Sequence, residues 1–116
     1  MKVAGRIVEL SDQVLSMNVN GNYIALKTGT GPNSNAVTVT KYEDRVSFFI
    51  RSTALLDRAK TEGFDPEIAK QTSPSKAHRY RFWGLSYFDL QEHEGLFREI
   101  VKESVSTIID RRPKKH

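Results

Sequence analysis

Basic and aromatic side chains alternate along residues 78–88, HRYRFWGLSYF. If this stretch is a strand, Arg79, Arg81 and Trp83 project to the same side, because successive side chains of a strand point to opposite faces. Basic groups neutralise phosphates, and an exposed aromatic ring can stack on a nucleic-acid base. The stretch therefore predicts a nucleic-acid site, for which the candidate residues are Lys76, His78, Arg79, Arg81, Trp83 and Tyr87.

Two other interpretations of the same residues stay open. In the first, Trp83 belongs to the core, and the arginines form a solvated strand face paired with the acidic C-terminal helix. In the second, Phe49, Trp83 and Tyr87 lie on an open face of the sheet and serve a protein partner or homodimerisation. Exposure of Arg79, Arg81 and Trp83 on one face favours nucleic-acid binding, whereas burial of Trp83 argues against it.

The chain offers little for histidine-based chemistry. His78, His93 and His116 are its histidines, and His93 stands between Glu92 and Glu94. These two carboxylates cannot both lie on the His93 face of a helix, so a metal site here needs ligands from elsewhere. No Ser/His/Asp or paired-carboxylate signature stands out. We expect a solvated helix turn around His93, no cofactor or metal, and a binding module rather than an enzyme, with a hydrolase as the third possibility.

The positive net charge is local. The chain carries a net charge of +4, but residues 1–69 are balanced and residues 82–110 are acidic. The excess lies in residues 70–81 and in the tail at 111–116. A high isoelectric point that arises from two short clusters does not by itself indicate general nucleic-acid binding.

Length and composition restrict the class of protein. The 116 residues fit one domain and include no cysteine, which removes disulfides and thiolate metal sites. No apolar run approaches the roughly 20 residues that a membrane helix needs, and Arg6 and Glu9 interrupt any signal peptide in the first ten residues. We therefore expect a cytoplasmic location and no membrane partner.

Residues 37–50, VTVTKYEDRVSFFI, alternate between the two sides of an extended chain in two successive runs. Their β-branched and aromatic residues suit a half-buried sheet, so the segment predicts a β-hairpin. Phe48 and Ile50 share a face that we expect to pack in the core against the C-terminal helix, with Ile100 and Val101 among the contacts. The connection between the two strands lacks the glycine of the tightest turns, so a longer loop is equally consistent with the sequence.

Helix signals occur in four other segments. Apolar residues spaced three and four apart predict a helix over residues 2–17, with a strand over residues 5–10 as the alternative. Ser52 and Gly63 are typical start and stop residues for a helix over residues 53–62. An aspartate and a proline predict a short helix over residues 66–71, and a wide apolar stripe predicts a helix over residues 92–110.

The remaining segments read as turns, loops and strands. These are a turn at residues 18–22, a strand at 23–28, a loop at 29–35, a loop at 72–77 that is a candidate for disorder, and a strand at 78–88 bent at Gly84. Together the elements predict an α+β domain over residues 1–110 in the order helix-strand-strand-strand-helix-strand-helix. We expect a four-stranded, mainly antiparallel sheet with helices on one face, the other face partly open, and a basic mobile tail at 111–116.

Three short motifs carry a family resemblance. They are Tyr23-Ile24-Ala25-Leu26-Lys27, Asp65-Pro66 ahead of a polar loop, and Trp83-Gly84 leading into a C-terminal helix. With the order of elements, they resemble an uncharacterised domain found at the C-terminus of bacterial predicted transport proteins and beside restriction-type endonuclease regions. The resemblance covers roughly residues 3–109 and implies an accessory domain with no established chemistry.

Overall fold

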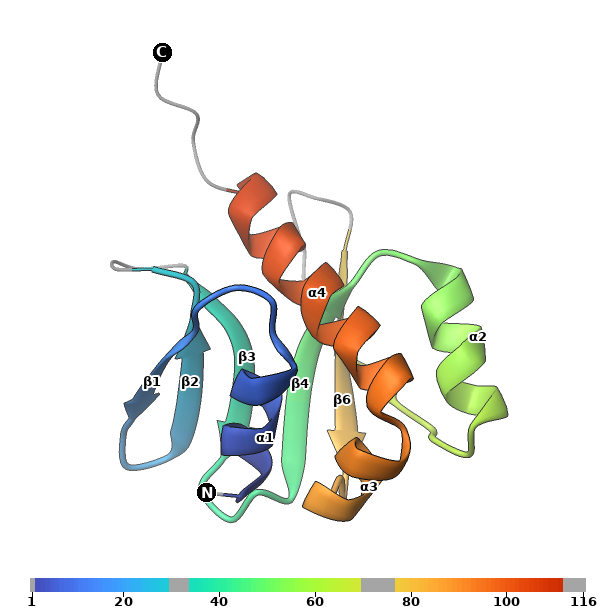
Figure 1. Ribbon diagram of the computed structural model, residues 1–116, viewed down its shortest axis with the longest axis horizontal. Coiled ribbons are helices and arrows are strands. Elements are labelled where there is room, and N and C mark those ends of the chain that lie inside the picture. The colour runs from blue at the N-terminus through green and yellow to red at the C-terminus, as the bar shows by residue number, and fades with distance from the viewer. Residues whose placement is uncertain (1, 30–33, 70–76, 112–116) are drawn as a thin grey trace.

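The computed structural model describes residues 2–29, 34–69 and 77–111. Within these residues, six strands form one antiparallel sheet, and the helices lie together on one face of it (Figure 1). The predicted α+β class with an antiparallel sheet is confirmed, but the predictions of four strands and of the order helix-strand-strand-strand-helix-strand-helix are wrong. None of the described helices is long and apolar enough to cross a membrane.

The strands follow one another across the sheet in the order β1-β2-β3-β4-β6-β5. The first four form a meander, in which each strand pairs with the next along the chain. The chain then passes through a helix and returns as β5 and β6, of which β6 pairs with β4. The bounds are β1 (Ser16–Val19), β2 (Tyr23–Lys27), β3 (Asn35–Thr40), β4 (Arg45–Ile50), β5 (Glu67–Ala69) and β6 (His78–Trp83).

The helical layer consists, in the described part of the chain, of α1 (Lys2–Leu10), α2 (Thr53–Thr61), α3 (Tyr87–Glu92) and α4 (Glu94–Arg111). The long α4 packs on β3 and β4, and the three shorter helices surround it (Figure 1). Every second residue of the central strands faces this layer, which explains the alternation of apolar and polar residues in their sequences. No helix of the described residues lies on the opposite face of the sheet (Figure 1).

The core lies between α4 and the central strands. Phe48 is fully buried, and its ring lies 5.5 Å from the ring of Phe82 and 6.4 Å from that of Phe97. Ile50, Ile100 and Val101 are buried in the same cluster. The predicted hairpin, its inward face and its position against the C-terminal helix are therefore confirmed.

The connection between β3 and β4 also holds the first helix. Glu43 has φ of 58°, in the left-handed region that few residues other than glycine adopt. In this conformation its Oε2 accepts hydrogen bonds from the backbone N–H groups of Val3, at 2.7 Å, and Ala4, at 3.3 Å. The carboxylate thus satisfies free amides at the start of α1 and places that helix beside the sheet.

The predicted helix over residues 2–17 is too long. The chain leaves the helix after Leu10, and Ser11 exchanges hydrogen bonds with the backbone of Gln13 in the turn that follows. Val14, which the helical spacing placed on the apolar face, is 94% exposed. The next residues form β1, because pairing with β2 satisfies more backbone groups than a frayed helix end does.

Sheet pairing also overrides the short helix predicted over residues 66–71. The chain instead forms β5 at Glu67–Ala69, which pairs with β6. The helix predicted over residues 53–62 is confirmed, since Ser52 accepts a hydrogen bond from the backbone N–H of Leu55. A local start signal alone does not decide between a helix and a strand when a free sheet edge is adjacent.

The strand predicted over residues 78–88 ends at Trp83. Gly84 has φ of 67°, and Ser86 and Asp89 form a capping box that begins α3. The predicted C-terminal helix is confirmed as α4, which begins at Glu94, and α3 precedes it as a separate helix that ends at Glu92. A glycine interpreted as a bend within one strand is therefore the boundary between a strand and a helix.

Four predictions fall partly outside the described residues. They concern residues 30–33 of the loop at 29–35, residues 70 and 71 of the short helix at 66–71, residues 72–76 of the loop at 72–77, and residues 112–116 of the tail. Lys76, one of the candidate nucleic-acid residues, also lies outside.

Candidate functional site

The helix-free face of the sheet gathers basic and aromatic side chains. On β6, Arg79, Arg81 and Trp83 project to this face, while Tyr80 and Phe82 are buried on the helix side. The register places Arg45 of β4 directly opposite Trp83. Trp83 is 54% exposed, and the guanidinium carbon of Arg45 lies 5.4 Å from its ring centroid. This is the geometry of a cation–π contact.

Arg79 reaches across the sheet rather than out into solvent. Its Nη2 donates a hydrogen bond of 3.1 Å to Oγ1 of Thr38, which belongs to β3, two strands away. The side chain must therefore cross β4, where the small and buried Ser47 leaves room for it. Nε of Arg79 is buried and has no hydrogen-bond partner among the described residues. Such unsatisfied buried donors are uncommon in folded proteins.

Three guanidinium groups influence one another on this face. Burial, followed by the neighbouring positive charges of Arg81 and Arg45, lowers the pKa of Arg79 from its ordinary value, and Tyr23 opposes this effect. Arginine stays charged in proteins despite such effects, so the three groups produce a region of positive potential.

In the described part of the chain, Glu67 is the carboxylate that contacts the basic and aromatic side chains of this face. Its Oε1 lies 3.6 Å from Nη1 of Arg81, and its Oε2 accepts a 3.0 Å hydrogen bond from Nε1 of Trp83. Glu67 belongs to β5, at the edge of the sheet. It neutralises part of the charge near Arg81 and orients the indole, but no contact joins it to Arg45 or Arg79.

Two adjoining hollows lie on the same face. The first has a volume of about 370 Å³ and is lined by Asn22, Tyr23, Asn35, Thr38, Thr40, Arg45 and Arg79. The second has a volume of about 340 Å³ and is lined by Asn22, Thr40, Lys41, Tyr42, Asp44, Arg45 and Trp83. Arg45 lines both, so the two hollows form one polar surface that runs from Arg79 to Trp83.

The structure brings some of the predicted site residues together and separates others. Arg79, Arg81 and Trp83 share the helix-free face, as the alternation predicted. His78 projects to the opposite face, where its ring lies 6.2 Å from that of Tyr80. Tyr87 is in α3, beyond the end of the strand.

The alternative that buries Trp83 and pairs the arginines with the C-terminal helix is wrong, because Trp83 is exposed and α4 lies on the other face.

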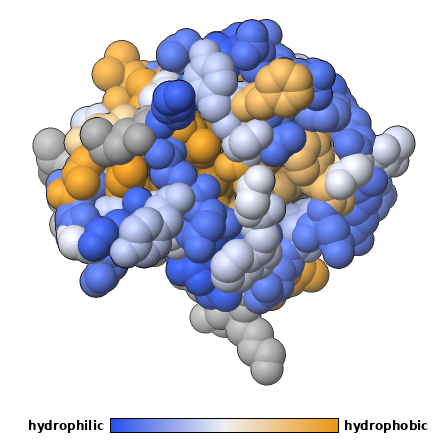
Figure 2. Space-filling model, turned by 90° about the horizontal axis from the view of Figure 1, so that it is seen from below, coloured by the Kyte–Doolittle hydropathy of each residue, from blue (hydrophilic) through white to orange (hydrophobic). Residues whose placement is uncertain are grey.

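Tyr87 belongs to a separate part of the surface. It and Phe88 are exposed on α3. Figure 2 views the molecule from the end that carries α3 and the β3–β4 connection, and it shows hydrophobic patches interrupted by hydrophilic side chains. Phe49, the third aromatic residue proposed for a protein contact, is only partly exposed and packs against the core. The three aromatic residues therefore do not form one apolar surface.

Sequence reasoning did not identify Arg45, Thr38 and Tyr23 as members of the site. Arg45 shares the period-2 pattern of Ser47 and Phe49, so its face could have been inferred from β4 alone. Its position opposite Trp83 could not have been inferred from the sequence, because no local pattern specifies that β6 pairs with β4.

The histidine region has a structural role. Nδ1 of His93 lies 2.8 Å from Oε1 of Glu62, and the His93 ring lies 4.9 Å from that of Phe64. The hydrogen bond with His93, more than the adjacent Arg58, lowers the pKa of Glu62 against the effect of burial. These contacts join the end of α2 to the start of α4. No group of three potential metal-ligating side chains occurs in residues 2–29, 34–69 and 77–111.

Comparison of the chain with protein-family models, with curated proteins and with solved structures finds no match.

Proposed function

We propose that this protein is a non-enzymatic binding module that holds single-stranded nucleic acid on the helix-free face of its sheet. The observation that carries the proposal is the placement of Arg45, Arg79 and Arg81 on one face beside the half-exposed Trp83. Positive charge attracts the phosphate backbone, and an exposed indole offers a surface for base stacking. Stacking on an aromatic side chain contributes about 1–3 kcal/mol per base.

The shape of the face favours a single strand over a duplex. Duplex DNA is read by an element that enters a groove, such as a helix or a two-stranded ribbon. The described part of the helix-free face instead has two hollows that are open to solvent. Unpaired bases can lie on such a surface with their ring faces against an aromatic side chain.

The family resemblance remains a prediction, and an accessory domain of restriction-type proteins would be a suitable setting for such a module. A protein-interaction or homodimerisation module is the alternative.

The experiment uses the fluorescence of Trp83, the single tryptophan of the chain. Titration with oligothymidylate should quench this fluorescence, because stacking brings a base against the indole. The affinity should fall with added salt through counterion release, and Arg79→Ala/Arg81→Ala should flatten the log-log salt dependence by about 1.4 units. A labelled oligonucleotide followed by fluorescence anisotropy measures the same quantities for Trp83→Phe, which should bind more tightly than Trp83→Ala because it keeps an aromatic ring.

The matched control is Lys60→Ala/Lys102→Ala, which removes two positive charges from α2 and α4 on the other side of the sheet. It should leave most of the salt dependence in place. Absence of binding at about 50 mM salt, where electrostatic attraction is strong, would overturn the proposal. A molar mass by light scattering that changes with Trp83→Ala in the absence of nucleic acid would support the homodimerisation alternative instead.

A further inference from the structure

We propose that the hollow around Arg79 is a subsite for one phosphate group, able to bind a phosphorylated small molecule as well as a segment of a nucleic-acid strand. The inference deepens the proposed function by naming the group that this part of the face takes, and it depends on Arg79 rather than on Trp83.

The guanidinium of Arg79 is incompletely hydrogen-bonded. A guanidinium has five N–H donors, and Arg79 uses Nη2 on Thr38 while its buried Nε has no partner among the described residues. A charged donor removed from water is costly unless it is paired. Arg6 also has an unpartnered Nε, but its other nitrogens pair with the carboxylates of Glu9 and Glu94. No carboxylate in the described part of the chain contacts Arg79.

The residues that line the hollow favour an anion. Besides Arg79 and Arg45, the hollow is lined by neutral polar groups: the hydroxyls of Thr38 and Tyr23, the amides of Asn22 and Asn35, and Thr40, whose hydroxyl already donates to Asp44. No aspartate or glutamate is among the described residues that line it. A surface of guanidinium, hydroxyl and amide groups without a carboxylate suits an anion and disfavours a metal cation.

The charge and the size of the hollow match a phosphate group. Two guanidinium groups at one hollow match the double negative charge of a phosphate monoester better than the single charge of a carboxylate. The volume of about 370 Å³ lies within the range of small-molecule sites. It exceeds what a lone phosphate needs and leaves room for an attached sugar. A phosphate at this point would pair with the terminal nitrogens of the Arg79 guanidinium, since Nε is itself buried, and would reduce the repulsion between Arg79 and Arg45.

The position of Arg45 links this subsite to the indole. Arg45 lines the Arg79 hollow and also lies over the Trp83 ring. Thr38 and Trp83 are two strands apart, which corresponds to about 10 Å across a sheet. A strand that places a phosphate at Arg79 can therefore extend toward Trp83 without leaving the face.

The test is a titration with a nucleoside monophosphate, inorganic phosphate and the corresponding nucleoside, followed by amide NMR at constant ionic strength set with chloride. The two phosphorylated ligands should shift the amides of Thr38, Thr40 and Tyr23 and leave those of α4 unchanged, and the nucleoside should shift neither. Arg79→Gln should abolish this binding. Arg79→Lys should weaken it about tenfold or more, because an ammonium keeps the charge but not the planar set of donors. Circular dichroism of each variant checks that it folds.

Each other result has a definite meaning. Equal phosphate affinity in Arg79→Lys and the unmodified chain, or amide shifts that chloride reproduces, would overturn the subsite. Oligonucleotide binding that survives Arg79→Gln, with no phosphate binding in the unmodified chain, would overturn the subsite and leave the proposed function standing. Phosphate binding through Arg79 without any oligonucleotide binding would support the subsite and overturn the nucleic-acid proposal.

Discussion

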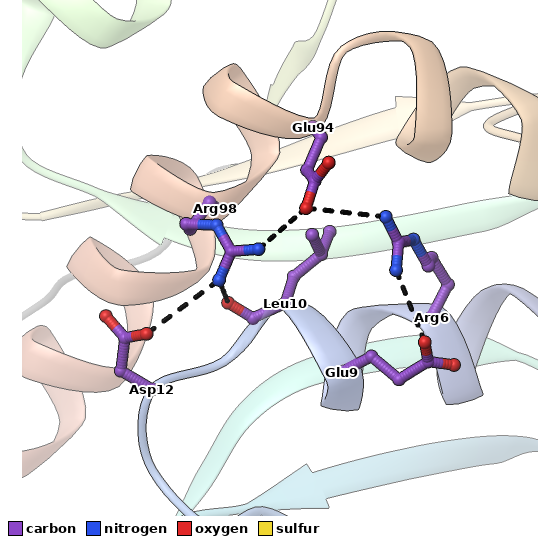
Figure 3. A network of polar contacts seen from close by, with 6 residues as sticks. All are labelled: Arg6, Glu9, Leu10, Asp12, Glu94 and Arg98. Carbon is purple, nitrogen blue, oxygen red and sulfur yellow. Dashed lines mark hydrogen bonds and ion pairs between the residues drawn. The ribbon is translucent and has the colours of Figure 1, made fainter.

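The two sides of the sheet use arginine in different ways. On the helix side, Arg98 contacts the carboxylates of Glu94, at 2.7 Å, and Asp12, at 3.8 Å, and donates to the backbone oxygen of Leu10. Arg6 contacts Glu94 as well, and the network joins α1 to α4 (Figure 3). On the helix-free side, Arg79 contacts a threonine hydroxyl and lies near two other arginines.

This difference separates a structural role from a binding role. An arginine that pairs with carboxylates of the chain, as Arg98 does, holds two elements together. Its charge and its N–H donors are then largely occupied and attract a ligand only weakly. An arginine that is partly buried beside like charges is less favourable for the folded state, and an anion can offset that cost. The following variants test whether the two sides differ as this comparison requires.

The largest effect is expected from Phe48→Ala in the core. Removing a fully buried ring should lower the free energy of unfolding by about 3–5 kcal/mol, measured by urea denaturation. Phe49→Ala, one residue along but on the helix-free face, should cost clearly less because that ring is only partly buried. Equal losses for the two variants would contradict the division between a packed side and an open side.

A smaller effect is expected from Glu43→Ala. The change removes the acceptor for the amides of Val3 and Ala4 and should lower the free energy of unfolding by about 0.5–2 kcal/mol, the range for lost helix caps. Glu43→Gln keeps an acceptor oxygen and should lose less. Hydrogen exchange should show faster exchange in α1 than in α4 for the alanine variant. Uniform acceleration would show that Glu43 does not act through α1.

Glu62 should make stability depend on acid pH. Its folded-state pKa is lowered from 4.5, chiefly by the hydrogen bond with His93, so the stabilisation is present above pH 4.5 and is lost as the pH falls through the folded pKa. Glu62→Gln should cost about 1 kcal/mol at neutral pH. Thermal unfolding of both proteins over this range should show the difference shrinking in acid. A difference that grows below pH 4.5 would contradict the assignment.

The smallest effects come from a matched pair of arginine variants. Arg98→Met removes a paired, partly exposed charge and should lower the free energy of unfolding by about 0.2–1 kcal/mol. Arg79→Met removes an incompletely bonded charge from beside two like charges and should leave stability unchanged or slightly raised. A loss at Arg79 that exceeds the loss at Arg98 would mean that Arg79 is part of the structural framework after all.

The sequence by itself determined the features that depend on neighbouring residues. The alternation in residues 37–50 specified the hairpin and placed Phe48 and Ile50 in the core. The same period placed Arg79, Arg81 and Trp83 on one face of β6. Side-chain direction along a strand follows from backbone geometry alone, so a short segment carries the information.

Only the tertiary structure decided which segments meet. The sequence predicts a helix at the edge strand β5 and a helix end followed by a turn at the edge strand β1, because their local signals are weak and their pairing partners lie elsewhere in the chain. The β4–β6 pairing brought Arg45 to Trp83, and β5 brought Glu67 to Arg81. The turn at Gly84 took Tyr87 away from the sheet. Strand neighbours are selected by burial and by backbone hydrogen bonds between distant segments, which no local period records.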